Sequence, residues 1–453
     1  MEKKIKSSMC EKICYGLGGL GANFVWTFMS LYVTMYYTNS VGISAAAAGT
    51  MMLVARLLDG VSDVFFAWLM QKVHFKMGKI KPWLLICAPL LSVSLLVSFN
   101  VPGSFTDTQK LIYIYVTYTF TAAISYTIFN LAFASTLPLI SFDEQDRVNA
   151  SSVYNFIVMG GIMVMSLLTP VLLAKFGGVA ASGSWSKISI IYAIICLIGV
   201  TLMGLMIKEK AAPVEVTSEA NAAQNGPKMT FRETLKIVLK SKYTWMLLLA
   251  FFAFYLYSGA SSGLGTYYFM YVLGDVSLSS FGTSSLFTTA AQFISFLIIP
   301  FLVAKLGRKK VVSFGIVVLI AASIMRLINP TNLEFCIVIA VVTMFGLTPA
   351  MSLIYIYIAD ITDEIASKYN GFRPAETVSM ISSIGTKVGT GIGSALVGWS
   401  LASFRFKAED LVQSAATTNG LIQLMVWLPV ITLGIVGIIL AMWDIGADAK
   451  KKN

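Results

Sequence analysis

The residues most able to do chemistry are three charged side chains within one long apolar stretch. Arg56, Asp59 and Asp63 are spaced i, i+3 and i+7, so in a helix they share one face. A charge inside a bilayer costs at least about 2.5–3.5 kcal/mol, and such residues usually face a cavity and mark an ion pathway. We therefore expect Asp59 and Asp63 to bind a cation, either as a Na⁺ site or as a shared proton site. The alternative is a static pair with Arg56, but one arginine cannot neutralise two aspartates.

A fourth charge, Lys387, lies in the glycine-rich apolar segment 385–393. A lysine deep in such a segment needs a carboxylate partner, and Asp59 or Asp63 is the available one. The alternative is that its long side chain reaches the membrane surface, although Lys387 is far from both ends of the segment. The glycines themselves are typical of helices that pack closely.

Two further apolar segments carry amides beside aromatic rings. Asn23 and Trp26 lie in one, and Tyr126 and Asn130 lie one helical turn apart in the other. An amide both donates and accepts hydrogen bonds, and a ring covers the apolar face of a sugar. We expect these four residues to contact a polyhydroxyl solute. For each asparagine, the alternative is a hydrogen bond that joins two helices.

Composition predicts that the elements holding these residues are transmembrane helices. Hydrophobic residues make up 57% of the 453 positions and charged residues only 12%, whereas soluble domains carry about 25% charged residues. The apolar residues form about twelve runs, each near the roughly 20 residues that a helix needs to cross a bilayer. The expected spans are 13–37, 43–70, 82–101, 109–138, 151–174, 186–207, 243–272, 279–304, 311–329, 334–360, 377–402 and 420–443.

The net charge of +11 is distributed unevenly along the chain. Segments that would share one face of the membrane with the N-terminus hold 25 of the 33 Lys and Arg, and the opposite loops hold six. This asymmetry follows the positive-inside rule and predicts that both termini are cytoplasmic. It also accounts for the basic charge without nucleic acid. Five scattered cysteines and the single His74 indicate no disulfide framework and no zinc or haem site.

The spans divide six and six around one long polar segment. We expect a first six-helix bundle at 1–208, a cytoplasmic linker at 209–238 and a second bundle at 239–453. Within this polar segment, 229–240 is a candidate amphipathic helix at the membrane surface. Short basic loops with a glycine follow the second span of each half, at 71–81 and 305–310. This layout is that of the major facilitator superfamily.

The sequence also resembles the glycoside–pentoside–hexuronide:cation symporters, a group that includes the melibiose and glucuronide permeases. The resemblance runs nearly end to end, through residues 15–18, 45–63, 78–83, 359–360, 373–376 and the glycines around Lys387. It implies that Asp59 and Asp63 bind the coupling cation with help from Thr127. Ser62 stands where the melibiose permease has an asparagine and is a weaker candidate ligand.

Some positions depart from the melibiose permease. Asn23 and Asn130 stand in place of its sugar-binding aspartates, and Ala134 replaces a tryptophan of that pocket. An arginine expected early in span 5 is missing, with Tyr154 and Asn155 at the nearest positions. The resemblance therefore does not imply galactoside specificity, and it leaves H⁺ and Na⁺ open as coupling ions.

Together these features predict a secondary active transporter that imports a sugar or glycoside by symport with H⁺ or Na⁺. The alternative is an exporter, or a permease for a non-sugar solute. No nucleophile–base pair or metal cluster indicates an enzyme, and no cofactor beyond the coupling ion is expected. We expect a monomer with many spans in the bacterial inner membrane, in contact with lipid, a sugar-like solute and the coupling cation.

Overall fold

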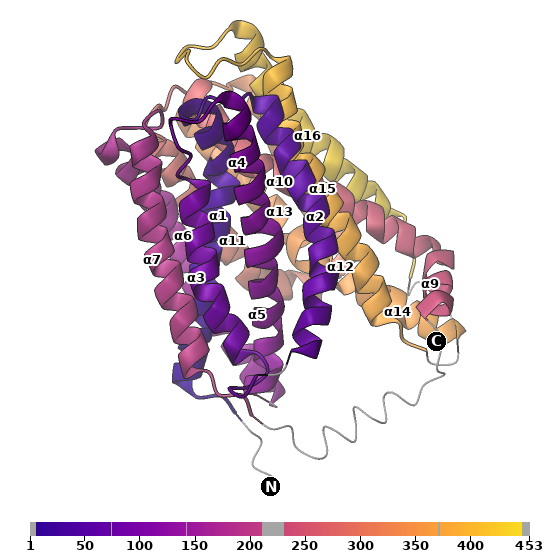
Figure 1. The fold of residues 1–453 in the computed structure, drawn as a ribbon. Helices are drawn as coiled ribbons and strands as arrows, with labels where there is room; N and C mark the ends of the chain where they lie inside the picture. The colour runs from indigo at the N-terminus through magenta and orange to yellow at the C-terminus, as the bar shows by residue number, and fades with distance from the viewer. Residues whose placement is uncertain (1–5, 74, 142, 211–230, 370–371, 446–453) are drawn as a thin grey trace.

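The computed structural model describes residues 6–73, 75–141, 143–210, 231–369 and 372–445, and it is helical throughout (Figure 1). The first half contains α1 (Met9–Met35), η1 (Tyr36–Ser40), α2 (Ala45–Lys72), α3 (Lys81–Ser98), α4 (Asp107–Thr119), η2 (Phe120–Ser125), α5 (Tyr126–Ile140), α6 (Glu144–Phe176) and α7 (Ser182–Met206). The second half contains α9 (Phe231–Lys240), α10 (Lys242–Tyr271), α11 (Ser279–Leu306), α12 (Arg308–Met325), η3 (Arg326–Ile328), α13 (Leu333–Leu353), α14 (Ile356–Lys368), α15 (Ala375–Ser403) and α16 (Ala415–Ala441).

Nine helical segments of the described chain are long and apolar enough to cross a membrane. The three long helices outside this set are α1, α2 and α15, with 27, 28 and 29 residues. They lie in the same bundle as the nine and bring the long segments to the twelve predicted from the sequence. Their composition is less apolar because they carry the charged and hydroxyl-bearing side chains described below.

The segment between the two halves lies largely outside the described residues. Of the predicted linker at 209–238, the structure describes residues 209–210 and α9, and α9 falls within the segment 229–240 where an amphipathic helix is expected. Glu209 accepts backbone hydrogen bonds from Lys79, Ile80 and Lys81 at the start of α3. This carboxylate therefore ties the end of the first half to its basic loop.

The two halves meet where α2 packs on α15, α1 on α10 and α6 on α11. At the α2–α15 contact, a Cβ added to Gly398 would lie 2.9 Å from the Cα of Gly49. Close to this point, Trp399 donates a hydrogen bond to Thr50 (3.1 Å). The halves are therefore joined tightly at the end of the molecule where α2 begins and α15 ends.

Hydrogen bonds reinforce the same end. Thr38 and Asn39 bond across to Tyr267 and Tyr271 at the end of α10. At the opposite end, the ion pairs Lys12–Asp146 and Arg308–Asp360 each lie within one half. In Figure 1, α2 and α15 run side by side, whereas the lower ends of α5 and α14 stand apart. The arrangement is that of a two-bundle protein closed at one end.

Close packing of α15 on α10 depends on three glycines four residues apart. A Cβ on Gly389 or Gly393 would overlap the carbonyl oxygens of Phe252 and Leu256, and one on Gly385 would lie 2.8 Å from another α10 carbonyl. Such small-residue stripes let membrane helices approach closely. Three of the glycines expected to serve packing are at this contact.

We predict that Gly389→Leu lowers the melting temperature of the purified protein by several degrees, because overpacking a close contact costs about 1–3 kcal/mol. The matched control is Gly160→Leu in α6, where an added Cβ meets no atom within 4 Å. Thermal unfolding followed by tryptophan fluorescence measures the difference. Equal melting temperatures for the two variants would contradict the assigned role of Gly389.

Candidate functional site

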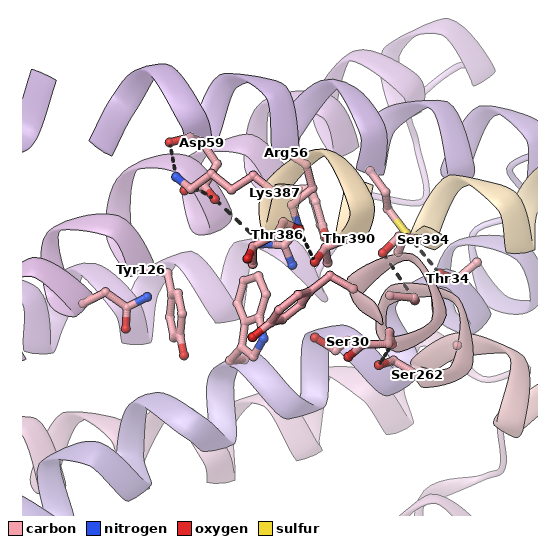
Figure 2. A pocket seen from close by; sticks show the side chains of 18 of the residues that line it. Ser30, Thr34, Arg56, Asp59, Tyr126, Ser262, Thr386, Lys387, Thr390 and Ser394 are labelled. Atoms are coloured by element: carbon pink, nitrogen blue, oxygen red, sulfur yellow. Dashed lines mark hydrogen bonds and ion pairs between the residues drawn. The ribbon is translucent and has the colours of Figure 1, made fainter. Parts of the chain in front are cut away.

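A cavity of about 560 Å³ lies between the two halves. Figure 2 shows side chains from α1, α2, α5, α10 and α15 that face it. Its lining consists of Trp26, Ser30, Thr34, Met52, Arg56, Asp59, Asp63, Tyr118, Tyr126, Asn130, Leu131, Tyr255, Ser258, Gly259, Ser262, Gly263, Thr386, Lys387, Thr390, Ser394 and Val397. The cavity is therefore formed by both halves and is rich in hydroxyl groups.

Two carboxylates and one ammonium group form the charged centre of the cavity. The Nζ of Lys387 lies 3.4 Å from Oδ2 of Asp59 and 2.5 Å from Oδ2 of Asp63, and it donates to the Asp59 carbonyl at 2.8 Å. Thr127 donates to the other oxygen of Asp59 at 2.8 Å. Asp59 is 9% exposed, so its negative charge is balanced mainly by these neighbours.

The local sequence explains why these groups meet. Asp59 and Asp63 are four residues apart on α2, so both point from one face toward α15. Gly60 lies between them, and a Cβ there would be 3.8 Å from the Lys387 side chain. On α15, Gly391 leaves room for Arg56, because a Cβ at Gly391 would lie 2.9 Å from the Arg56 Cβ. At Gly391 a small residue thus lets the two charged helices approach each other, whereas Gly60 makes only an ordinary van der Waals contact.

Arg56 belongs to a stack of flat groups beside the carboxylates. Its guanidinium carbon lies 4.1 Å from the centre of the Trp26 ring, and Trp26 stacks on Tyr126 with ring centres 4.5 Å apart. The nearest guanidinium nitrogen is 3.9 Å from Asp59. This cation–π contact stabilises Arg56 and leaves two aromatic rings on the cavity wall. Such a wall suits the apolar face of a sugar.

A π-helical turn precedes the tyrosine of this stack. In the segment Asp107–Leu137, η2 (Phe120–Ser125) separates α4 from α5, which begins at Tyr126. Such insertions shift the register of the following residues and are frequent at functional sites. Here Tyr126 and Asn130, one turn apart after η2, both line the cavity.

Seven of the ten residues predicted from the sequence line the cavity. These are Trp26, Arg56, Asp59, Asp63, Tyr126, Asn130 and Lys387. Thr127 is not part of the lining but contacts Asp59 from behind and is 2% exposed.

The other two predicted residues lie outside the lining. Ser62 donates to the carbonyl of Asp59 in its own helix at 3.0 Å. Asn23 donates to the carbonyl of Gly19, also in its own helix, at 2.8 Å. Their expected roles in cation and solute binding stay predictions, and neither side chain contributes to the cavity wall in this structure.

Sequence reasoning missed the hydroxyl groups that the second half contributes. They come from α10 and α15 and comprise Ser258, Ser262, Thr386, Thr390 and Ser394. A signal was present, because the α15 hydroxyls stand four residues apart beside Lys387 and the two α10 serines are also four apart. This spacing alone indicates a polar stripe on each helix.

Known proteins match this chain along nearly its whole length. A family model described as MFS/sugar transport protein matches residues 14–447. The isoprimeverose transporter of Lactiplantibacillus pentosus is 27% identical over 441 residues, covering 96% of this chain and 88% of the transporter. The inner membrane symporter YicJ of Escherichia coli (strain K12) is 25% identical over 449 residues, covering 94% of this chain and 89% of YicJ.

A solved structure has the same fold. The inward-facing, unoccupied form of a bacterial homologue of the human lysosomal transporter Spinster matches with a TM-score of 0.69 at 14% identity, and 96% of each chain is covered. At this identity the likeness shows the arrangement of helices alone.

Proposed function

Because this chain belongs to the MFS/sugar transport protein family, we propose that it imports a sugar or glycoside by symport with H⁺ or Na⁺. The expected membership of the glycoside–pentoside–hexuronide:cation symporters is confirmed, and the chain is a transporter rather than an enzyme. It spans the membrane many times. The proposal adds the solute class, the coupling ion and the direction of transport.

The observation that carries the proposal is that one cavity holds both the carboxylates and a sugar-compatible wall. Asp59 and Asp63 offer oxygen ligands to a cation. Hydroxyls, the Asn130 amide and the Trp26–Tyr126 stack offer hydrogen bonds and an apolar face to a solute. A cavity of about 560 Å³ is within the range of small-molecule sites. An isoprimeverose transporter and a symporter among the relatives support the same solute class and coupling.

We further propose that the protein is a monomer in the bacterial inner membrane with both termini in the cytoplasm. The orientation is supported by the 25-to-six division of Lys and Arg between the two faces. In that orientation, the end at which α2 packs on α15 is the external one. The cavity then belongs to a state closed to the outside.

Ion movement driven by the solute tests this function. Inverted vesicles containing the protein are supplied with neutral glycosides, pentosides or hexuronides, and the pH change is followed with and without Na⁺. A solute-dependent pH change indicates H⁺ coupling, and a solute-dependent movement of ²²Na⁺ indicates Na⁺ coupling. Vesicles without the protein are the control. The proposal is wrong if no solute of these three classes moves either ion while the protein is present and folded.

We predict that Asn130→Leu weakens solute affinity by about ten-fold or more, because a hydroxyl left without its amide partner costs about 1–3 kcal/mol. Asn130 is exposed on the cavity wall. Asn149→Leu is the matched control, because Asn149 is exposed near the start of α6 and lies outside the cavity lining. Equilibrium binding of the best solute from the vesicle screen gives both affinities. An unchanged solute affinity in Asn130→Leu would indicate that Asn130 serves helix packing and does not contact the solute.

A further inference from the structure

A second cavity, of about 280 Å³, lies mainly in the C-terminal half and is bordered by Leu31 of α1 from the first half. Helices α10, α11, α12, α13 and α16 form its wall together with η3. Its lining comprises Leu31, Tyr257, Ser261, Ser262, Leu264, Gly265, Phe269, Phe281, Ser284, Ser285, Thr288, Ser323, Arg326, Ala340, Thr343, Met344, Met425, Leu428 and Pro429. Ser262, labelled in Figure 2, also lines the first cavity, and the two cavities therefore share this residue.

Arg326 is the charged residue of this wall. By its position near the end of the expected span 311–329 it is one of the six Lys and Arg expected at the external face, but in the structure it begins η3 and is only 5% exposed. Its guanidinium carbon lies 5.4 Å from the ring centre of Tyr268. Within the described residues no carboxylate lies at ion-pair distance from it, and its Nε has no hydrogen-bond partner.

A buried arginine without a partner is energetically unusual. Arginine keeps its charge at any physiological pH and presents five N–H donors. A ring face weakly stabilises the cation but accepts none of these hydrogen bonds in the plane of the guanidinium. Burying an unpaired charge costs several kcal/mol, so an anion or an acceptor is expected in the adjoining space.

The surrounding wall fits a small oxyanion. Among the described residues no aspartate or glutamate lines the cavity, so no competing negative charge from them repels an anion. The hydroxyls of Ser284 and Ser285 on α11 also line it, and within the described part of the chain neither forms a side-chain hydrogen bond. Serine hydroxyls can donate to an oxyanion while a planar guanidinium binds two of its oxygens at once.

We infer that the second cavity is an anion-binding site in which Arg326 and the α11 serines hold a carboxylate or sulfonate group. Two sources of that group fit the geometry. One is the acid group of an acidic sugar that reaches past Ser262 from the first cavity, and this source rests on the function proposed above. The other is a small free anion that binds in the second cavity alone.

Binding measurements on the full-length protein in lipid nanodiscs test the site. The probes are D-glucuronate, D-glucose, acetate and methanesulfonate, with affinities measured by calorimetry in a buffer without competing oxyanions. We expect at least one of the anionic probes to bind, and Arg326→Gln to weaken that binding by about ten-fold or more. Glucuronate binding without acetate or methanesulfonate binding identifies the acidic sugar. Binding of the small anions identifies the free anion.

Two variants make the test independent of folding defects. Lys310→Gln removes an exposed positive charge from α12, the helix that leads into η3, and should leave anion affinity unchanged. Arg326→Lys keeps the charge but loses the planar fork, so its affinity should be intermediate. The inference is overturned if none of the anionic probes binds the wild-type protein, or if folded Arg326→Gln or Arg326→Lys binds them as tightly as the wild type.

The vesicle assay separates this inference from the proposed function. If neutral glycosides still drive ion movement in Arg326→Gln while anion binding is lost, both the function and the site are supported. If no solute moves an ion but anion binding depends on Arg326, the function is wrong and the site stands.

Discussion

Replacing Asp59 or Asp63 by asparagine should abolish uphill accumulation of solute while leaving solute exchange measurable. Asparagine keeps the size of the side chain but removes the negative charge that a cation needs. Hydrogen bonds to a charged group contribute about 1.5–3 kcal/mol. The cation affinity should therefore fall by about ten-fold to more than 100-fold. The solute-facing wall of Trp26, Tyr126 and Asn130 is not altered by either change.

The measurement is solute uptake into vesicles as a function of an imposed ion gradient, beside counterflow of labelled solute without a gradient. Asp107→Asn is the matched control, because Asp107 is an exposed carboxylate (93%) of the same half, paired with Lys110. We expect the control to behave like the wild type. If both cavity variants still accumulate solute to wild-type levels, the coupling site lies elsewhere in the protein.

The charged centre could be predicted because charges are conspicuous in apolar spans. Asp59, Asp63 and Lys387 each carry a large energetic cost in a bilayer, which leaves few structural reasons for their presence. The spacing of the two aspartates then determines that they share a face. The contact between Lys387 and the span that holds the aspartates could also be predicted. It followed from electrostatics, since few other carboxylates lie within the expected spans.

The serine and threonine residues that line the first cavity could not be predicted in the same way. Serine and threonine can bond to a carbonyl of their own helix, so they cost little wherever they stand in a span. Thr390 and Ser262 line the cavity although each donates to a carbonyl one turn earlier. Ser62 does the same and lies outside the lining. Which of these faces a cavity is decided by packing between helices, which local sequence does not encode.

Residues near the ends of spans were the hardest to place. Arg326 stands near the end of the expected span 311–329, where an exposed position at the external face is the simplest interpretation. The turn of η3 instead directs it into the C-terminal half, where it is buried. The predicted spans themselves were close to the observed helices, because a bilayer constrains helix length more strongly than it constrains side-chain direction.

Lys387→Gln should have the opposite effect on the cation from the aspartate variants. In this structure the Lys387 ammonium lies where it compensates both carboxylates, 3.4 Å from Asp59 and 2.5 Å from Asp63. A cation binding there must first displace it, so only the fraction of molecules with the lysine withdrawn is competent to bind. Removing the ammonium should therefore raise the apparent cation affinity by about ten-fold or more.

Turnover should fall in the same variant, by about ten-fold or more. In the wild type, Lys387 can replace the departing cation and so keep the buried carboxylates neutralised. Without it, cation release leaves two carboxylates with the Arg56 guanidinium as their one positive neighbour among the described residues, and the return of the ion-free transporter becomes slow. By linkage, tighter cation binding should also be accompanied by tighter solute binding.

Cation activation curves for solute binding and for uptake, measured with Na⁺ at fixed pH and with H⁺ in the absence of Na⁺, separate the two effects. Lys387→Arg is the control, because it keeps a positive charge at the same position and should leave the cation affinity low. Tighter cation binding with slower uptake in Lys387→Gln alone supports a mechanism in which cation and lysine alternate at the two carboxylates. Unchanged or weaker cation affinity in folded Lys387→Gln would show that the lysine does not compete for the site, and its contact with Asp59 and Asp63 would then serve to hold α2 against α15.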